Sequence, residues 1–155
     1  EHSGDHFQIE VAAYPEMHPQ ADSFDLDIKR FCDKANAGAN AALTQFFFNP
    51  DAYFYFVERI QKEGVNIPVA PGIMPITNAS NLIRFADGTG AEIPRWIRKQ
   101  LATYGDDTAS IKAFGHEVVV KLCERLIAGG APSLHFYTMN TTDPTRQLVL
   151  DLGLA

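Results

Sequence analysis

Four apolar segments, each ending in polar or aromatic side chains, recur along this chain and constrain its fold more than any other feature. They read VAAYPEMHP at 11–19, LTQFFFNPDAY at 43–53, IPVAPGIMPITN at 67–78 and LHFYTMN at 134–140. Segments with helical periodicity separate them, and this strand-then-helix order predicts parallel strands joined by right-handed crossovers. Because parallel α/β proteins build their sites at the carboxyl ends of strands, we expect these side chains to gather at one edge of the sheet.

The strand and helix signals predict half of a barrel. Strands are expected at 7–14, 41–48, 67–73 and 133–139. Helices are expected at 23–37, 50–64, from 78 until DGTG at 87–90 breaks the chain, from 94, from 106 to the Gly-Gly at 129–130, and at 144–152. A closed (β/α)8 barrel needs eight strands, so four parallel strands with intervening helices predict an α/β half-barrel. We expect 1–155 to be a single partial domain, with the other half absent from this chain.

Composition excludes several classes of partner. The 155 residues are 46% hydrophobic, enough for a core, and carry a formal charge of -6. Since Lys and Arg do not cluster, neither nucleic acid nor an anionic membrane is expected as a partner. No apolar stretch approaches the ~20 residues that span a bilayer, and EHSGDHF at 1–7 lacks the design of a signal peptide, so a cytoplasmic protein is expected.

The two cysteines do not predict a disulfide or a metal site. Cys32 and Cys123 lie in helix-like patterns without C-x-x-C spacing, which favours buried, reduced thiols. No set of His, Cys and carboxylates has zinc spacing, and GTG at 88–90 does not fit a dinucleotide fingerprint. No metal is therefore expected, and no catalytic residue is identified from motifs.

The first strand exit carries residues suited to a ligand. Tyr14, Glu16 and His18 lie in YPEMHP, which two prolines make stiff, so they could cradle a planar or phosphorylated ligand. The alternative is an exposed loop whose His has no role. Asp27 and Lys34 are seven residues apart on one helical face and could reach a ribose or phosphate, although a solvated charged face explains them too.

Other candidates lie at the later strand exits. The amide of Gln45, near the end of a buried strand, suits the edge of a heteroaromatic ring, unless neighbouring backbone satisfies it. Phe85 could stack on a ligand or belong to the core. Tyr137 and Asn140 are ligand contacts if their side of the last strand faces the barrel mouth, and otherwise core or rim residues.

Four blocks together resemble one family. AAYPE-x-HP, AGAN followed by TQFFF, PGI-x-P-x-(S/T)N and HFYT-x-N, in this order, are similar to those of methylenetetrahydrofolate reductases over nearly the whole chain. The resemblance implies a (β/α)8 barrel with FAD at the carboxyl ends of its strands, of which this chain supplies strands five to eight. It implies that FAD contacts Ala12, Tyr14, His18, Ala21, Asp27 and Lys34. It implies substrate contacts at Gln45, Asn81, Phe85 and Tyr137.

The resemblance also implies an activity. NAD(P)H reduces FAD by hydride transfer, and the flavin reduces 5,10-methylenetetrahydrofolate to 5-methyltetrahydrofolate, a step of one-carbon metabolism and methionine biosynthesis. Gln45 would contact the pterin and nicotinamide, Phe85 would stack on either ligand, and Tyr137 would line the folate site. The proton-donating Glu of the family belongs to the absent half, so this chain alone is expected to be inactive.

Two positions depart from the family pattern. Thr141 stands where an arginine suited to the folate carboxylates is common, and Asn81 stands where glutamine is frequent. Two other functions stay open from the residues alone, namely a non-catalytic α/β ligand-binding module and another flavin barrel such as a proline dehydrogenase. Because a half-barrel exposes two strand edges, we expect a homo-oligomer or pairing with the missing half.

Overall fold

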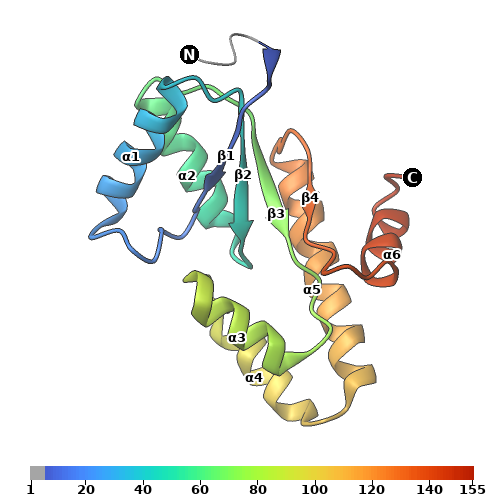
Figure 1. The fold of residues 1–155 in the computed structure, drawn as a ribbon. Coiled ribbons are helices and arrows are strands. Elements are labelled where there is room, and N and C mark those ends of the chain that lie inside the picture. Colours follow the sequence, from blue (N-terminus) through green and yellow to red (C-terminus); the bar gives the residue numbers. More distant parts are fainter. Residues whose placement is uncertain (1–5) are drawn as a thin grey trace.

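The sheet has four parallel strands in sequential order. The computed structural model describes residues 6–155, so most of the segment 1–7, which is expected not to be a signal peptide, lies outside the described residues. The strands are β1 (Glu10–Ala13), β2 (Ala41–Phe46), β3 (Val69–Ile73) and β4 (His135–Phe136), and each pairs in parallel with the next. Figure 1 shows the strands running side by side toward the region occupied by α3 and α4.

Helices follow every strand, which is the repeating unit of an α/β barrel. They are α1 (Phe24–Asn36), α2 (Pro50–Lys62), α3 (Ala79–Thr89), α4 (Arg95–Tyr104), α5 (Thr108–Ala128) and α6 (Asp143–Asp151). The connection between β3 and β4 contains three helices, of which α3 and α4 lie beyond the carboxyl ends of the strands (Figure 1). The predicted α/β half-barrel with four parallel strands is confirmed.

Polar caps begin four of the helices, as their sequence signals predict. Side-chain oxygens of Ser23, Asn49, Asn78 and Asp107 accept hydrogen bonds from main-chain N–H groups in the first turns of α1, α2, α3 and α5. Each bond satisfies a donor that has no partner within the helix and contributes about 1 kcal/mol. The helix starts therefore follow directly from local sequence.

Two strands are shorter than predicted. The expected strand at 7–14 begins only at Glu10, because β1 lies at the edge of the sheet and, among residues 6–155, pairs with β2 alone. The expected strand at 133–139 reduces to His135–Phe136, because it pairs only with Gly72 and Ile73 of β3. Edge strands have one set of ladder partners, so their length depends on their neighbour rather than on their own composition.

The helix that begins after Asn78 ends within DGTG, as predicted, although it includes the first three residues of that segment. Helix α3 continues through Asp87 and Gly88 and ends at Gly90, which adopts a left-handed φ of 73°. Asp87 and Gly88 are exposed, so continuing the helix buries no unpaired polar group. The left-handed cap at Gly90 is the conformation that glycine adopts without a steric cost.

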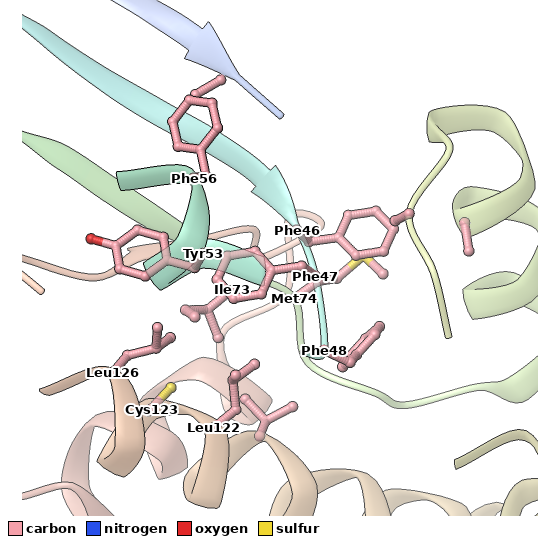
Figure 2. Packing of buried hydrophobic residues seen from close by; sticks show 14 of the residues in the cluster. Phe46, Phe47, Phe48, Tyr53, Phe56, Ile73, Met74, Leu122, Cys123 and Leu126 are labelled. Atoms are coloured by element: carbon pink, nitrogen blue, oxygen red, sulfur yellow. The ribbon is translucent and has the colours of Figure 1, made fainter. Parts of the chain in front are cut away.

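The core lies between the sheet and helices α1, α2 and α5. Figure 2 shows Phe47, Ile73 and Leu126 converging in this layer, and the Phe47 ring stacks on Tyr53 of α2 with centroids 5.8 Å apart. Burying one such side chain contributes about 1.5–3 kcal/mol. Phe46 and Phe48 point instead toward the α3–α4 side, with ring centroids 6.0 Å apart.

No helix within residues 6–155 is both long enough and apolar enough to cross a bilayer.

Candidate functional site

The turn after β1 holds two aromatic rings together. Pro15 is buried at the strand exit, and the N–H of Met17 donates to the carbonyl of Tyr14 at 3.3 Å. Met17 has a φ of 103°, a strained conformation for a residue other than glycine, with a cost of about 1–3 kcal/mol. This turn places the ring of His18 against the edge of Tyr14, with centroids 4.4 Å apart. The rings of Tyr14 and His18 therefore pack against each other at the exit of β1.

Two hydrogen bonds connect helix α1 to β1 and to the turn that follows it. The main-chain N–H of His18 donates to a carboxylate oxygen of Asp27 at 2.8 Å. The ammonium group of Lys34, two turns later, donates to the carbonyl of Ala12 in β1. Burial lowers the pKa of Lys34, and the nearby Asp27 carboxylate partly offsets this by favouring the charged form. Asp27 and Lys34 therefore both face the strand exit.

These residues surround a cavity of about 310 Å³ between β1 and α1. Five of the six residues expected at a cofactor line it, namely Ala12, Tyr14, His18, Asp27 and Lys34. The sixth, Ala21, does not line it, although its N–H donates to the carbonyl of His18 at 2.9 Å. The structure thus brings together residues as far apart in the sequence as Ala12 and Lys34, which are 22 positions apart.

The cavity suits a ligand with phosphate and hydroxyl groups. Lys34 and Arg30 supply positive charge, and Asp27 supplies carboxylate oxygens that accept from hydroxyls. The Nδ1 atom of His18 accepts the N–H of Gln20 at 3.1 Å, which leaves the imidazole proton on Nε2 as a donor. The volume of the cavity lies at the lower end of the range for ligand sites, so the cavity would accommodate part of a large ligand.

Arg30 is a cavity residue that the sequence analysis missed. It lies three residues after Asp27 and four before Lys34, so all three share one face of α1. The same helical spacing that singled out Asp27 and Lys34 therefore contained the signal for Arg30.

Gln45 and Glu16 line the same small recess, to which Tyr14 also belongs. They border a small recess of about 10 Å³ together with Thr89, Gly90 and Ala91 at the end of α3. The carboxylate of Glu16 accepts the main-chain N–H of Glu92 at 2.8 Å, and burial raises the pKa of Glu16 to about 7. The Oε1 atom of Gln45 accepts the N–H of Phe46 at 3.0 Å. The recess thus combines an amide with a carboxyl that titrates near neutrality.

The remaining predicted substrate residues do not border this recess. Asn81 is exposed on the first turn of α3, where its Oδ1 accepts a long hydrogen bond of 3.4 Å from Arg84. Phe85 is half-buried, and the guanidinium of Arg84 lies 5.3 Å from its ring centroid. The hydroxyl of Tyr137 donates to the carbonyl of Thr44 at 2.9 Å. Most of the residues predicted to bind a cofactor therefore line one cavity, whereas the residues predicted to bind substrate do not line a common one.

A larger cavity lies beside Thr141. Its volume is about 790 Å³, and residues of α5, of α6 and of the segments before α6 and after β3 line it. Lys112 and His116 of α5 line it, and the Nε2 atom of His116 lies 2.7 Å from the carboxylate of Asp151 on α6. Within the described part of the chain, no group of three or more His, Cys, Asp or Glu could hold a metal ion.

Comparison of the fold with solved structures gives a related architecture. An uncharacterized protein from Clostridium thermocellum that binds two copies of 5-methyl-5,6,7,8-tetrahydrofolic acid superposes with a TM-score of 0.63. The likeness covers 96% of this chain and 53% of that one, at 18% sequence identity. At this identity the likeness concerns the fold alone.

Comparison of the sequence gives closer relatives. A 5,10-methylenetetrahydrofolate reductase of Buchnera aphidicola is 38% identical over 148 residues, 96% of this chain and 51% of the relative. That of Escherichia coli strain K12 is 36% identical over 148 residues, 96% of this chain and 50% of the relative. The chain therefore spans about half the length of these relatives. The family model of methylenetetrahydrofolate reductase matches residues 1–153, and the chain belongs to this family.

Proposed function

We propose that this chain is the C-terminal half of the catalytic barrel, strands five to eight, of an enzyme that reduces 5,10-methylenetetrahydrofolate to 5-methyltetrahydrofolate with NAD(P)H and FAD. Membership of the family and the names of relatives at 36–38% identity support the reaction. The activity of the whole enzyme is proposed rather than observed, since the chain spans about half of those relatives. The folate bound by the Clostridium thermocellum protein is consistent with a folate substrate.

The single observation that carries the proposal is the cavity between β1 and α1. Lys34 and Arg30 would bind the diphosphate of FAD, because cations recognise phosphate oxygens. One oxygen of Asp27 accepts from His18, so the other is available to a ribose hydroxyl. When bound, FAD supplies the hydride chemistry, and the protein supplies position and polarity. The residues at this cavity therefore fit the polar part of the cofactor.

Substrate binding is proposed around Gln45. Its Oε1 is used by the main chain, so its Nε2 carries the donors that would bind acceptor atoms of the pterin or nicotinamide. Phe85, whose ring is half exposed beside Arg84, would provide a stacking surface, with Asn81 one turn before it. Tyr137 would offer its ring, since its hydroxyl already donates to Thr44.

We also propose a partner for the open edges of the sheet. β1 and β4 each pair on one side only within the described residues, and unpaired edges attract further strands. The remaining half of the barrel, or a second copy of the chain, would complete them. A cytoplasmic place in one-carbon and methionine metabolism is proposed with the reaction, and the free thiols of Cys32 and Cys123 are consistent with a reducing compartment.

The visible absorbance spectrum of the purified protein tests the cofactor. We expect the two flavin bands after FAD is added and unbound FAD is removed, either with this chain or with a protein that joins it to the N-terminal half of a family member. The joined protein should then oxidise NAD(P)H only when a folate acceptor or another electron acceptor is present. A joined, folded protein that retains no FAD would contradict the proposal and favour a non-catalytic ligand-binding module.

A further inference from the structure

Strand β2 contains a bulge immediately before its aromatic end. Leu43 pairs with Ala70, and the next pair joins Phe46 to Gly72, so three steps along β2 match two steps along β3. The extra residue lies at Thr44 and Gln45, which is the definition of a β-bulge. Bulges redirect side chains next to functional sites. This one lies at the only glutamine expected to contact substrate.

Two hydroxyl groups hold the bulge. Thr44 is completely buried, and its Oγ1 accepts the N–H of Gly72 at 2.8 Å. The main-chain carbonyl of Thr44 accepts the hydroxyl of Tyr137 at 2.9 Å, although the two residues are 93 positions apart. These bonds satisfy main-chain groups at the break in the ladder, where a buried group without a partner costs about 1–3 kcal/mol.

Gly72 makes room for this arrangement. A Cβ atom at this position would lie 2.2 Å from the carbonyl oxygen of Thr44 and 2.7 Å from Cε2 of Tyr137. Both distances are shorter than any real carbon contact, so a side chain here would displace one of the two groups. The absent side chain therefore lets the Tyr137 ring pass over β3 and reach β2.

The bulge determines where the Gln45 amide points. Gln45 is half-buried at the recess that Tyr14 and Glu16 share, and its Oε1 is held by the N–H of Phe46. Because an N–H donor requires an oxygen acceptor, this bond assigns the two ends of the amide. Within the described residues no hydrogen bond uses the Nε2 donors, so this end is available to a ligand.

We propose that Tyr137 is a positioning residue that acts through Gln45. Its hydroxyl fixes the Thr44 carbonyl, which fixes the bulge and so directs the Nε2 donors of Gln45 toward the acceptor atoms of a heteroaromatic substrate. The inference rests on the proposed function for the identity of that substrate. It differs from a role in which Tyr137 itself contacts the substrate through its hydroxyl, because that group is already occupied.

The first test needs no activity. In the chain carrying Tyr137→Phe, NMR should show the exchange of the Phe46 N–H with water rising about tenfold and the side-chain amide signals of Gln45 shifting, while the amides of α5 keep their exchange rates. Tyr104→Phe is the matched control, since its hydroxyl accepts from Gln100 on α4, away from the bulge. Unchanged Phe46 exchange in folded Tyr137→Phe would overturn the proposal.

A second pair of variants covers the case in which Tyr137→Phe does not fold. Thr44→Val removes the hydroxyl that accepts from Gly72 and keeps the side-chain shape, so it should reproduce the change at Phe46 and Gln45. Thr44→Ser keeps the hydroxyl and should restore the wild-type signals. Equal behaviour of the valine and serine variants would contradict the role of the hydroxyl bridge.

The last test is a double-mutant cycle in the protein that joins this chain to the N-terminal half of a family member. Tyr137→Phe should raise the KM for methylenetetrahydrofolate about fivefold with kcat nearly unchanged, and the effect should fall below about twofold in a Gln45→Ala background. The same loss with and without Gln45 would mean that Tyr137 acts on its own, which would overturn the proposal. Absence of activity in the folded joined protein without substitutions would refute the proposed function instead, while the NMR result still decides the positioning role.

Discussion

The carboxylate of Glu16 accepts a hydrogen bond of 2.8 Å from the main-chain N–H of Glu92, 76 residues later in the chain. Glu16 belongs to the turn that carries Tyr14 and His18, and Glu92 lies between α3 and α4. The bond therefore joins the turn after β1 to the segment between α3 and α4. Burial, and to a smaller extent the Glu92 charge, oppose ionisation of Glu16, and its pKa rises from 4.5 to about 7.

This raised pKa predicts that stability falls as the pH rises. Below pH 4.5 the carboxyl is protonated in both the folded and the unfolded chain, so it has no effect. Between pH 4.5 and about 7 the unfolded chain releases the proton first, which favours unfolding, and above pH 7 the full penalty applies.

Glu16→Gln keeps an acceptor for the main-chain N–H of Glu92 and removes the charge. We expect it to raise the free energy of unfolding at pH 8 by about 1–2 kcal/mol, a value reduced for partial exposure, and to have little effect at pH 4.

Urea unfolding followed by circular dichroism at the two pH values measures this difference. Glu92→Gln is the control, because it keeps the main-chain donor and removes only the smaller charge repulsion, so its effect should have the same sign and a smaller size. If Glu16→Gln is equally stabilising at pH 4 and pH 8, ionisation of Glu16 is not the cause.

The close approach at Gly72 predicts a large loss of stability for Gly72→Ala. The new methyl group would lie 2.2 Å from the carbonyl oxygen of Thr44, which is main chain in a buried strand and cannot move freely. We expect a loss of about 3 kcal/mol or more in the free energy of unfolding. Gly88→Ala is the matched control, because Gly88 lies in α3 with no atom within 4 Å of the new group, so a gain of about 0.5–1 kcal/mol is expected there. Similar effects at both glycines would refute the close packing.

The two cysteines are expected to be unreactive in the folded chain. Burial raises the pKa of Cys123 to about 12, and burial also raises the pKa of Cys32, so little of the reactive thiolate is present at pH 8. A thiol reagent such as DTNB should therefore modify neither residue within minutes under native conditions, and both in 6 M guanidinium chloride at about the rate of a free thiol. Rapid reaction of one thiol without denaturant would show that its surroundings open readily.

Local sequence signals predict the helices and bring together the residues that line the cavity between β1 and α1. Ser23, Asn49 and Asn78 identify helix starts because capping involves only neighbouring residues. Asp27 and Lys34 were recognised because two helical turns place them on one face, and the cavity between β1 and α1 contains both. Such features depend on periodicity and on the order of strand and helix, which the sequence displays directly.

Long-range pairing could not be read in the same way. The bulge at Thr44 depends on a hydroxyl from Tyr137 and a bare main chain at Gly72, and no local pattern connects these three residues. The shortness of β4 depends on its partner β3, and the raised pKa of Glu16 depends on burial beside the segment around Glu92, 76 positions later. Each of these requires knowledge of which distant segments meet, which is a property of the tertiary structure.

Loss of the Lys34 ammonium group is expected to weaken FAD binding specifically. In Lys34→Ala the carbonyl of Ala12 loses its donor and the cavity keeps Arg30 but loses the cation next to Asp27, so the phosphate groups of the cofactor would be bound by less positive charge. A hydrogen bond to a charged group contributes about 1.5–3 kcal/mol, so the Kd for FAD should rise about 10- to 100-fold. Quenching of flavin fluorescence in a form of the protein that binds FAD measures this change.

Lys29→Ala is the matched control, since Lys29 is exposed on the same helix and does not line the cavity. Equal weakening by both substitutions would indicate a general effect of charge rather than a phosphate contact at Lys34, and an unchanged Kd in Lys34→Ala would place the cofactor elsewhere.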